Sequence, residues 1–225
     1  MQRAVRMLSG LLLALTALSA GAAALQPDAV VQQTTEKVLA IVNEERANYE
    51  KAPQRFNERI EQTMAPVVDF DGFARGVMGR YASAQYYKSL QSDAERAAFR
   101  KQVERFTTTF RRGVIDTYAK GLFKFNGQRI ETLPGKPGAG GSVTVKQLIH
   151  GDAAQPYVVQ YTMRADSDGS WRVRNVVVEG INLGQTYRNQ FATAMQQNKN
   201  DIDRVIDNWR VEPDATANAN NGAAN

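Results

Sequence analysis

The stretch that decides the fold is residues 168–191, DGSWRVRNVVVEGINLGQTYRNQF. It opens on a turn, and in residues 171–174 apolar and charged side chains then alternate, as in a strand with one buried and one exposed face. The alternation fails at residues 176–178, three consecutive valines, which predicts a bulge or a strand end covered on both faces. The chain then passes through Gly180 into a segment with helical spacing, so the stretch joins a strand directly to a helix.

Three similar segments precede this one. They are LFKFNGQRIETL, SVTVKQLIHG and PYVVQYTMRA, at residues 122–133, 142–151 and 156–165. With SWRVRNVVVEGI at residues 170–181, they predict four strands. The connections between successive strands are short, which favours an antiparallel sheet.

Upstream of Gly121 the apolar period is helical. The strongest helix is predicted over residues 92–120, because Ser92 and Glu95 match a capping box and aromatic and aliphatic residues follow along one stripe. Gly121 is the expected C-cap. We expect this long helix to lie across one face of the sheet.

Shorter helices flank it on both sides. One is predicted from Pro27 to about residue 49 and a second from Pro53 to Pro66. A third begins near Asp71, the expected cap, and stops at Gly79. Residues 185–200 and 202–209 carry further helical stripes. Helices followed by strands predict an α+β fold, a curved antiparallel four-stranded sheet wrapped by helices.

The N-terminus has the features of a secretory signal. Arg3 and Arg6 precede the apolar residues 11–18, and small residues follow at positions 22 and 24. We predict that residues 1–24 are removed, that residues 25–212 form a single domain, and that the Ala- and Asn-rich residues 213–225 are a disordered tail. No later segment has the roughly 20 apolar residues that span a bilayer.

Composition excludes several function classes. The chain has no cysteine, so disulfides, thiol catalysis and cysteine-bound metals are excluded, and its single histidine argues against a multi-histidine metal site. The formal net charge is +5, and the signal carries two of those positive charges. The mature chain is therefore too weakly basic to indicate nucleic-acid binding.

A few polar residues are candidates for chemistry, each with a plainer explanation. His150 fits a strand-end turn, and residues 135–141 fit a flexible hairpin loop. Asp69 and Asp71 are a possible acid/base pair, although helix capping also explains them.

Two arginine pairs are more interesting. Arg111 and Arg112, like Arg172 and Arg174, fit either a solvated face or a contact with acidic head groups or an acidic partner. The large number of apolar residues in the long helix and the strands fits either a plain core or a cavity for an apolar ligand.

Several segments together resemble a known family. They are APVVDF at residues 65–70, VMGRY at 77–81, the long helix ending in Tyr118, and WRV at 171–173 leading through VEG to YRNQF at 187–191. In this order they resemble the periplasmic phospholipid-binding proteins of the Mla pathway, the MlaC or toluene-tolerance auxiliary family.

This resemblance implies a fold like that of nuclear transport factor 2 and a carrier without enzymatic activity, metal or cofactor. The ligand would be a phospholipid, with its acyl chains inside the fold and its head group outside. The expected partners are an outer-membrane lipoprotein–porin complex and an inner-membrane ABC transporter with a lipid-binding ring. We expect a monomeric protein in the periplasm of a Gram-negative bacterium.

Apolar side chains of the helices and strands are then expected to line the lipid cavity. They are Phe73, Val77, Met78, Phe99, Val103, Phe106, Phe110, Val114, Tyr118, Phe125, Val145, Val159, Tyr161, Met163, Trp171, Val173, Val176, Val178, Tyr187 and Phe191.

Two other functions stay open. Small α+β folds of this kind host isomerases and hydrolases, and Asp69 with a tyrosine could act on an apolar substrate. Alternatively, the apolar surplus could form a protein interface, which would make the chain a periplasmic adaptor.

Overall fold

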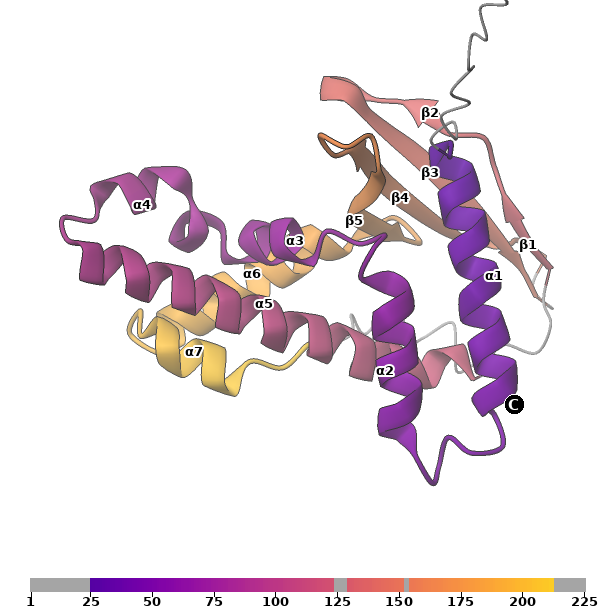
Figure 1. The fold of residues 1–225 in the computed structure, drawn as a ribbon, viewed down its shortest axis with the longest axis horizontal. Helices are drawn as coiled ribbons and strands as arrows, with labels where there is room; N and C mark the ends of the chain where they lie inside the picture. Colours follow the sequence, from indigo (N-terminus) through magenta and orange to yellow (C-terminus); the bar gives the residue numbers. More distant parts are fainter. Residues whose placement is uncertain (1–24, 124–128, 152–153, 213–225) are drawn as a thin grey trace, which may run out of the picture.

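The computed structural model describes residues 25–123, 129–151 and 154–212 (Figure 1). Along the chain, a first group of helices is followed by the strands of one antiparallel sheet and then by a second group of helices. Five helices come first: α1 (Pro27–Glu45), α2 (Pro53–Met64), α3 (Phe70–Met78), α4 (Ala84–Ser89) and α5 (Asp93–Leu122), with the 3-10 turn η1 (Gly79–Ala82) between α3 and α4. Two helices, α6 (Leu183–Gln197) and α7 (Ile202–Asn208), follow the strands. The predicted α+β class is confirmed.

The sheet has six strands where four were predicted. They are β1 (Arg129–Thr132), β2 (Lys136–Pro137), β3 (Ser142–His150), β4 (Tyr157–Ala165), β5 (Trp171–Val178) and β6 (Ile181–Asn182), and the short 3-10 turn η2 (Ala139–Gly141) joins β2 to β3. The order is β1-β3-β4-β5-β6, all antiparallel, with β2 paired to β3. The two additional strands have only two residues each, too few to show an alternating pattern. The first predicted strand was too long, because Leu122 ends α5.

The predicted bulge lies in β5. Thr162 pairs with Asn175, whereas Met163 pairs with Val173, so Arg174 is an extra residue on β5. A bulge of one residue reverses the side-chain parity beyond it. Val173 and Val176 therefore face the same side of the sheet.

A tight hairpin and a cap carry β5 into α6. Glu179 and Gly180 have φ values of 49° and 82°, the positive values of a two-residue turn that matches strand twist. The Asn182 side chain then caps α6 by accepting a hydrogen bond from the Gln185 N–H at 3.1 Å. The strand thus leads into a helix because Glu179 and Gly180 reverse the chain, and the two-residue β6 that follows ends at the cap of α6.

The register places one set of side chains on a common face of the sheet, here called the inner face. It comprises Val143, Val145 and Gln147 of β3, Val159, Tyr161 and Met163 of β4, and Trp171, Val173, Val176 and Val178 of β5. Tyr157 shares the same parity on β4.

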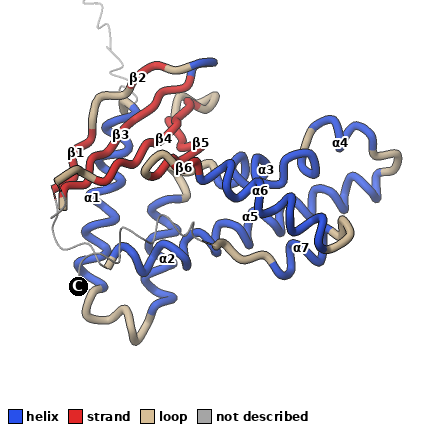
Figure 2. The backbone as a smooth tube through the Cα atoms, turned by 180° about the vertical axis from the view of Figure 1, so that it is seen from behind, coloured by secondary structure: helices blue, strands red, loops and turns tan. Residues whose placement is uncertain are grey.

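Helix α1 lies across the inner face, and this corrects the expectation for the long helix (Figures 1 and 2). Val31 of α1 packs with Val145 and Met163 in one buried cluster. Helix α5 instead packs against α2, α3 and α7. The reason is that side chains of α3, of α6 and of the residue after α7 cover its aromatic stripe, so the stripe is not available to the sheet.

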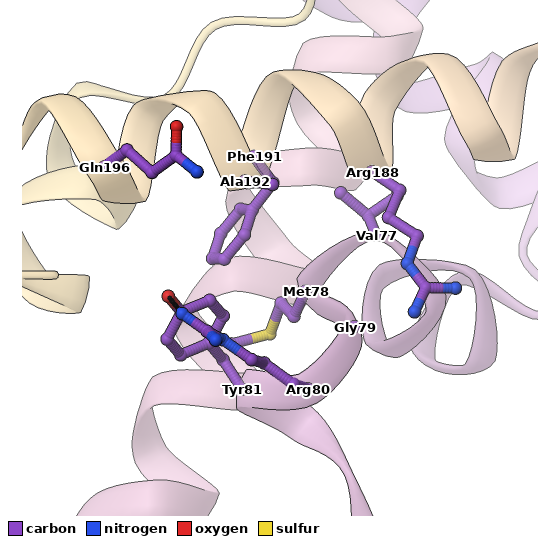
Figure 3. Close-up of a pocket in the computed structure, with 9 residues that line it drawn as sticks. All are labelled: Val77, Met78, Gly79, Arg80, Tyr81, Arg188, Phe191, Ala192 and Gln196. Carbon is purple, nitrogen blue, oxygen red and sulfur yellow. Dashed lines mark hydrogen bonds between the residues drawn. The ribbon is translucent and has the colours of Figure 1, made fainter.

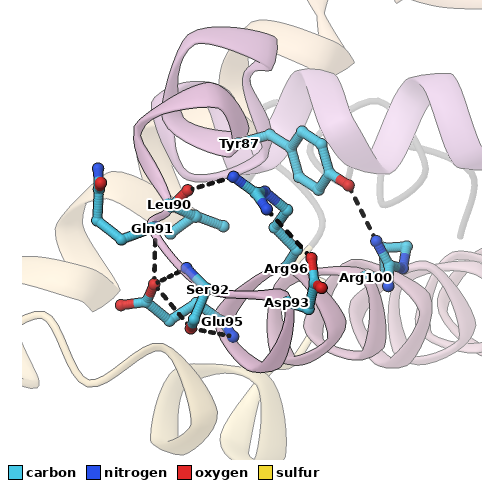
Figure 4. Close-up of polar contacts among 8 residues, drawn as sticks. All are labelled: Tyr87, Leu90, Gln91, Ser92, Asp93, Glu95, Arg96 and Arg100. Carbon is cyan, nitrogen blue, oxygen red and sulfur yellow. Dashed lines mark hydrogen bonds and ion pairs between the residues drawn. The ribbon is translucent and has the colours of Figure 1, made fainter.

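The capping box at the start of α5 is confirmed (Figure 4). The Ser92 hydroxyl accepts a hydrogen bond from the Glu95 N–H at 3.2 Å, and the Glu95 carboxylate accepts one from the Ser92 N–H at 2.8 Å. The expected C-cap was wrong by a residue or two, since the helix continues past Gly121.

The cap of α3 was assigned to the wrong aspartate. Asp69, not Asp71, accepts a hydrogen bond from the Gly72 N–H at 3.0 Å. Asp71 is inside the helix, where it pairs with Arg75 at 2.8 Å. Gly79 ends α3 with a φ of 58°, as its predicted helix-breaking position requires.

Within the described ranges, every helix is too short or too polar to cross a bilayer. The predicted signal at residues 1–24 and the predicted tail at residues 213–225 lie outside the described residues.

Candidate functional site

The residues expected to line a cavity fall into two groups in the structure. The first group belongs to the inner face: Val145, Val159, Tyr161, Met163, Trp171, Val173, Val176 and Val178. The second belongs to a cluster between α3, α5, α6 and α7, here called the helical cluster: Phe73, Val77, Met78, Phe99, Val103, Phe106, Phe110, Val114, Tyr118, Tyr187 and Phe191. Phe125 lies outside the described residues.

The helical cluster is filled by its own aromatic side chains. The Phe106 ring contacts the rings of Phe110, Phe191 and Trp209 at centroid separations of 5.9, 4.9 and 5.3 Å. Phe106 is 0% exposed. Rings in such edge-to-face and offset contacts form a close-packed core.

One end of the inner face is also sealed by protein. Val145 and Met163 are buried beneath Val31 of α1. The segment before α3 closes the edge of the sheet, because Val68 forms a parallel bridge with Val173.

A buried glutamine lies within this sealed part. Gln147, 2% exposed, donates hydrogen bonds to the hydroxyls of Thr35 on α1 and Thr132 on β1 at 2.9 and 3.1 Å. It accepts one from the Tyr161 hydroxyl at 2.8 Å. Burial raises the pKa of Tyr161, so this phenol stays a neutral donor. The network fixes α1 to the sheet by directional bonds.

Half-buried side chains flank the Val145 and Met163 cluster, with Val143 and Trp171 on one side and a further group toward the other end of the inner face. Val176 and Val178 are half-buried, as is Tyr157, while Val159 is buried beside them. This half-buried end, defined by Tyr157, Val159, Val176 and Val178, is an aliphatic and aromatic surface.

Two tyrosines of the helical cluster contact each other through their hydroxyls. The hydroxyls of Tyr118 on α5 and Tyr187 on α6 are 2.6 Å apart. Burial raises the pKa of Tyr157, and the nearby Glu179 and Tyr118 raise it further. Tyr118 therefore lies near both the helical cluster and the half-buried end, where the two predicted groups meet.

The candidate acid/base chemistry is not available at this site. The Asp69 carboxylate forms an ion pair with Arg174 and caps α3, and its side chain is 15% exposed. Asp166 pairs with the same arginine and with Arg172, whose Nε lies 3.0 Å away. Asp69, Arg172 and Arg174 thus join the segment before α3 to β5, which favours a structural role for this arginine pair.

The remaining candidates have structural partners too. His150 ends β3, with its Nε2 2.9 Å from Arg129 Nη2, and Arg111 pairs with Glu61 of α2 at 3.0 Å. The parts of the chain that the structure describes contain no group of three or more residues able to hold a metal ion.

Two residues of this region were missed from sequence. Tyr157 has the parity of Val159 and Tyr161, so continuing the alternation by one step would have found it. Gln147 interrupts an apolar face, and only its partners on α1 and β1 explain it.

A solved structure has the same fold. It is the phospholipid-binding protein from Ralstonia solanacearum in complex with a phospholipid, which superimposes with a TM-score of 0.64 at 21% sequence identity. The match covers 81% of this chain and 94% of the other.

Curated relatives match over similar lengths. The toluene tolerance protein ttg2D of Pseudomonas putida is 36% identical over 190 residues, which cover 84% of this chain and 82% of the relative. The intermembrane phospholipid transport system binding protein MlaC of Haemophilus influenzae is 22% identical, with coverages of 80% and 78%. Residues 32–211 match the family described as MlaC protein, so the chain belongs to the MlaC family.

Proposed function

We propose that this protein is a periplasmic phospholipid carrier, and not an enzyme, which moves lipid between membranes with the acyl chains against the half-buried end of the inner face. The observation that carries the proposal is that end itself: Val159, Val176 and Val178 share one face of the sheet, and Val176 and Val178 stay half-buried among the described residues. The names of the Haemophilus and Ralstonia relatives support phospholipid as the ligand class.

The energetics of transport require a container of this kind. At about 0.8 kcal/mol per methylene, exposing two acyl chains to water costs on the order of 20 kcal/mol. A carrier that crosses an aqueous compartment must therefore replace most of the apolar environment. It breaks no bond, which agrees with the structural roles of Asp69 and His150.

The proposed site belongs to a single domain of residues 25–212 that follows a removed signal at residues 1–24. Lipid would enter where the half-buried end meets Tyr118 and Tyr187, since the opposite end is sealed by α1. The head group would remain outside.

The proposed partners are an outer-membrane lipoprotein–porin complex and an inner-membrane ABC transporter with a lipid-binding ring. A ligand bound over a large apolar surface leaves slowly unless the state that holds it changes. We therefore infer that release requires a partner that separates helix from sheet or competes for the lipid.

The test is to purify the protein without detergent, extract it with organic solvent and identify the lipids by mass spectrometry. We expect diacyl phospholipid at up to one molecule per protein, and uptake of added phospholipid after refolding. The proposal is wrong if neither the purified nor the lipid-refolded protein yields phospholipid.

A further inference from the structure

A pocket lies away from the sheet, between α6, the end of α3 and the turn η1 (Figure 3). Its volume is about 310 Å³, and its lining residues are Val77, Met78, Gly79, Arg80, Tyr81, Arg188, Phe191, Ala192 and Gln196. Val77, Met78 and Phe191 are buried and form an apolar floor, whereas Arg80, Arg188, Ala192 and Gln196 are exposed and surround the opening. No strand contributes to it, so it is separate from the inner face.

Two guanidinium groups stand at this opening, and no lining residue is acidic. Within the described residues, neither Arg80 nor Arg188 has a carboxylate partner, although most other arginines near α5 and the sheet do. Two unneutralised positive charges beside a concave apolar surface produce a local positive potential.

Arg80 is held in place by a neighbouring ring. Its Nη2 donates a hydrogen bond to the Tyr81 hydroxyl at 2.6 Å, and its guanidinium carbon lies 4.7 Å from the centre of the Tyr81 ring. The same hydroxyl donates to Asn200 at 2.8 Å. These contacts orient the guanidinium but do not neutralise its positive charge, because the partners are a hydroxyl and an aromatic ring.

Arg188 is positioned by a glycine. Gly79 has a φ of 58°, and a Cβ at this position would lie 3.1 Å from Arg188 Nε. The guanidinium therefore packs directly on the backbone of the turn, and a Cβ at position 79 would require it to shift by a few tenths of an ångström. In Figure 3, the Arg188 side chain reaches from α6 down toward this turn.

We propose that this pocket binds a small amphiphilic anion, with a phosphate or carboxylate group held at the rim by the guanidinium groups of Arg80 and Arg188 and a short apolar part on the floor of Met78 and Phe191. Planar guanidinium groups bind these oxyanions through paired charge-assisted hydrogen bonds. The volume is at the lower end of the roughly 300–1,000 Å³ typical of drug-sized ligands, which fits one short chain and excludes a diacyl lipid.

Methionine labelling tests the proposal, because Met78 lines the pocket, whereas Met163 is buried between the sheet and α1 and serves as a remote reference. Protein with ¹³C-methyl methionine is titrated with octyl phosphate, with octanol and with inorganic phosphate. We expect octyl phosphate to shift the Met78 methyl resonance saturably and to leave Met163 unchanged. Octanol and inorganic phosphate should each bind at least about tenfold more weakly, since each lacks one half of the recognised ligand.

Two variants and a control sharpen the result. Arg80→Gln combined with Arg188→Gln should weaken octyl phosphate at least about tenfold, and Ala192→Phe should block the pocket without changing its charge. Arg112→Gln, an exposed arginine of α5 outside the pocket, should bind as the wild type does.

Unchanged affinity in the double variant, equal binding of octanol, or no Met78 shift would overturn the anion site. Inorganic phosphate binding as tightly as octyl phosphate would overturn the assignment to an amphiphile. Circular dichroism confirms that each variant is folded. Phospholipid content, measured on the same samples, reports the carrier function independently.

Discussion

The helical cluster and the inner face carry the same kinds of residues but are completed differently. Around Phe106 the chain supplies aromatic partners on every side, from α5, α6 and the segment after α7. On the inner face, α1 covers Val145 and Met163 completely, yet Val176 and Val178 at the other end stay half-buried. An apolar stripe therefore becomes part of the core only where another part of the chain packs against it.

The largest effect is expected where this comparison is most direct, at the adjacent valines Val176 and Val177. Both are half-buried, but Val176 pairs with Tyr161 on the inner face and Val177 pairs with Gln160 on the opposite face. We expect Val176→Asp to lose most bound phospholipid, because a carboxylate against acyl chains must be desolvated. Val177→Asp should retain it.

Lipid content per folded molecule, determined by extraction and mass spectrometry, is the measurement. Equal lipid content in the two variants would show that the acyl chains do not lie on the inner face.

A large stability effect with little effect on lipid is expected in the helical cluster. Phe106→Ala should lower the free energy of unfolding by about 3–5 kcal/mol, because it leaves a cavity among packed rings. Urea denaturation measures this, with Tyr86→Ala as the control, since that side chain is 45% exposed. If Phe106→Ala instead reduced lipid content without destabilising the fold, the helical cluster would itself be a lipid wall.

The smallest effect is expected from the capping box at the exposed N-terminus of α5. Ser92→Ala should reduce stability by about 1 kcal/mol through loss of its half of the capping box. Lipid content should stay the same. A change in lipid binding would mean that the end of α5 is coupled to the inner face.

The same capping box has a pH dependence of known sign. The backbone N–H groups of Ser92 and Gln91 donate to the Glu95 carboxylate and lower its pKa. The contribution is therefore fully present above the ordinary glutamate pKa and is lost as pH falls through the lower, folded-state value. The melting temperatures of wild type and Glu95→Gln should differ at pH 7 and converge in this acidic range.

Local features were predictable because they depend on neighbours in sequence. The α5 capping box needs only Ser92 and Glu95, and the failure of alternation at residues 176–178 indicated a bulge or a covered strand end close to the bulge found at Arg174. The choice between Asp69 and Asp71 as a cap failed, because both can accept from nearby N–H groups and Arg174, distant in sequence, holds Asp69 in place.

The amino-acid pattern alone was sufficient for the α+β class, the alternating faces of the strands, the break in the alternation of β5 and the apolar residues from which a lipid site can be built. These follow from periodicity and from short-range hydrogen bonds. Only the tertiary structure decided that α1 and not α5 covers the sheet, which end of the inner face stays half-buried, and that Arg80 and Arg188 share one pocket. The physical reason is that each of these features depends on which apolar or charged surfaces pack together in three dimensions. The residues that form those contacts are far apart in the chain.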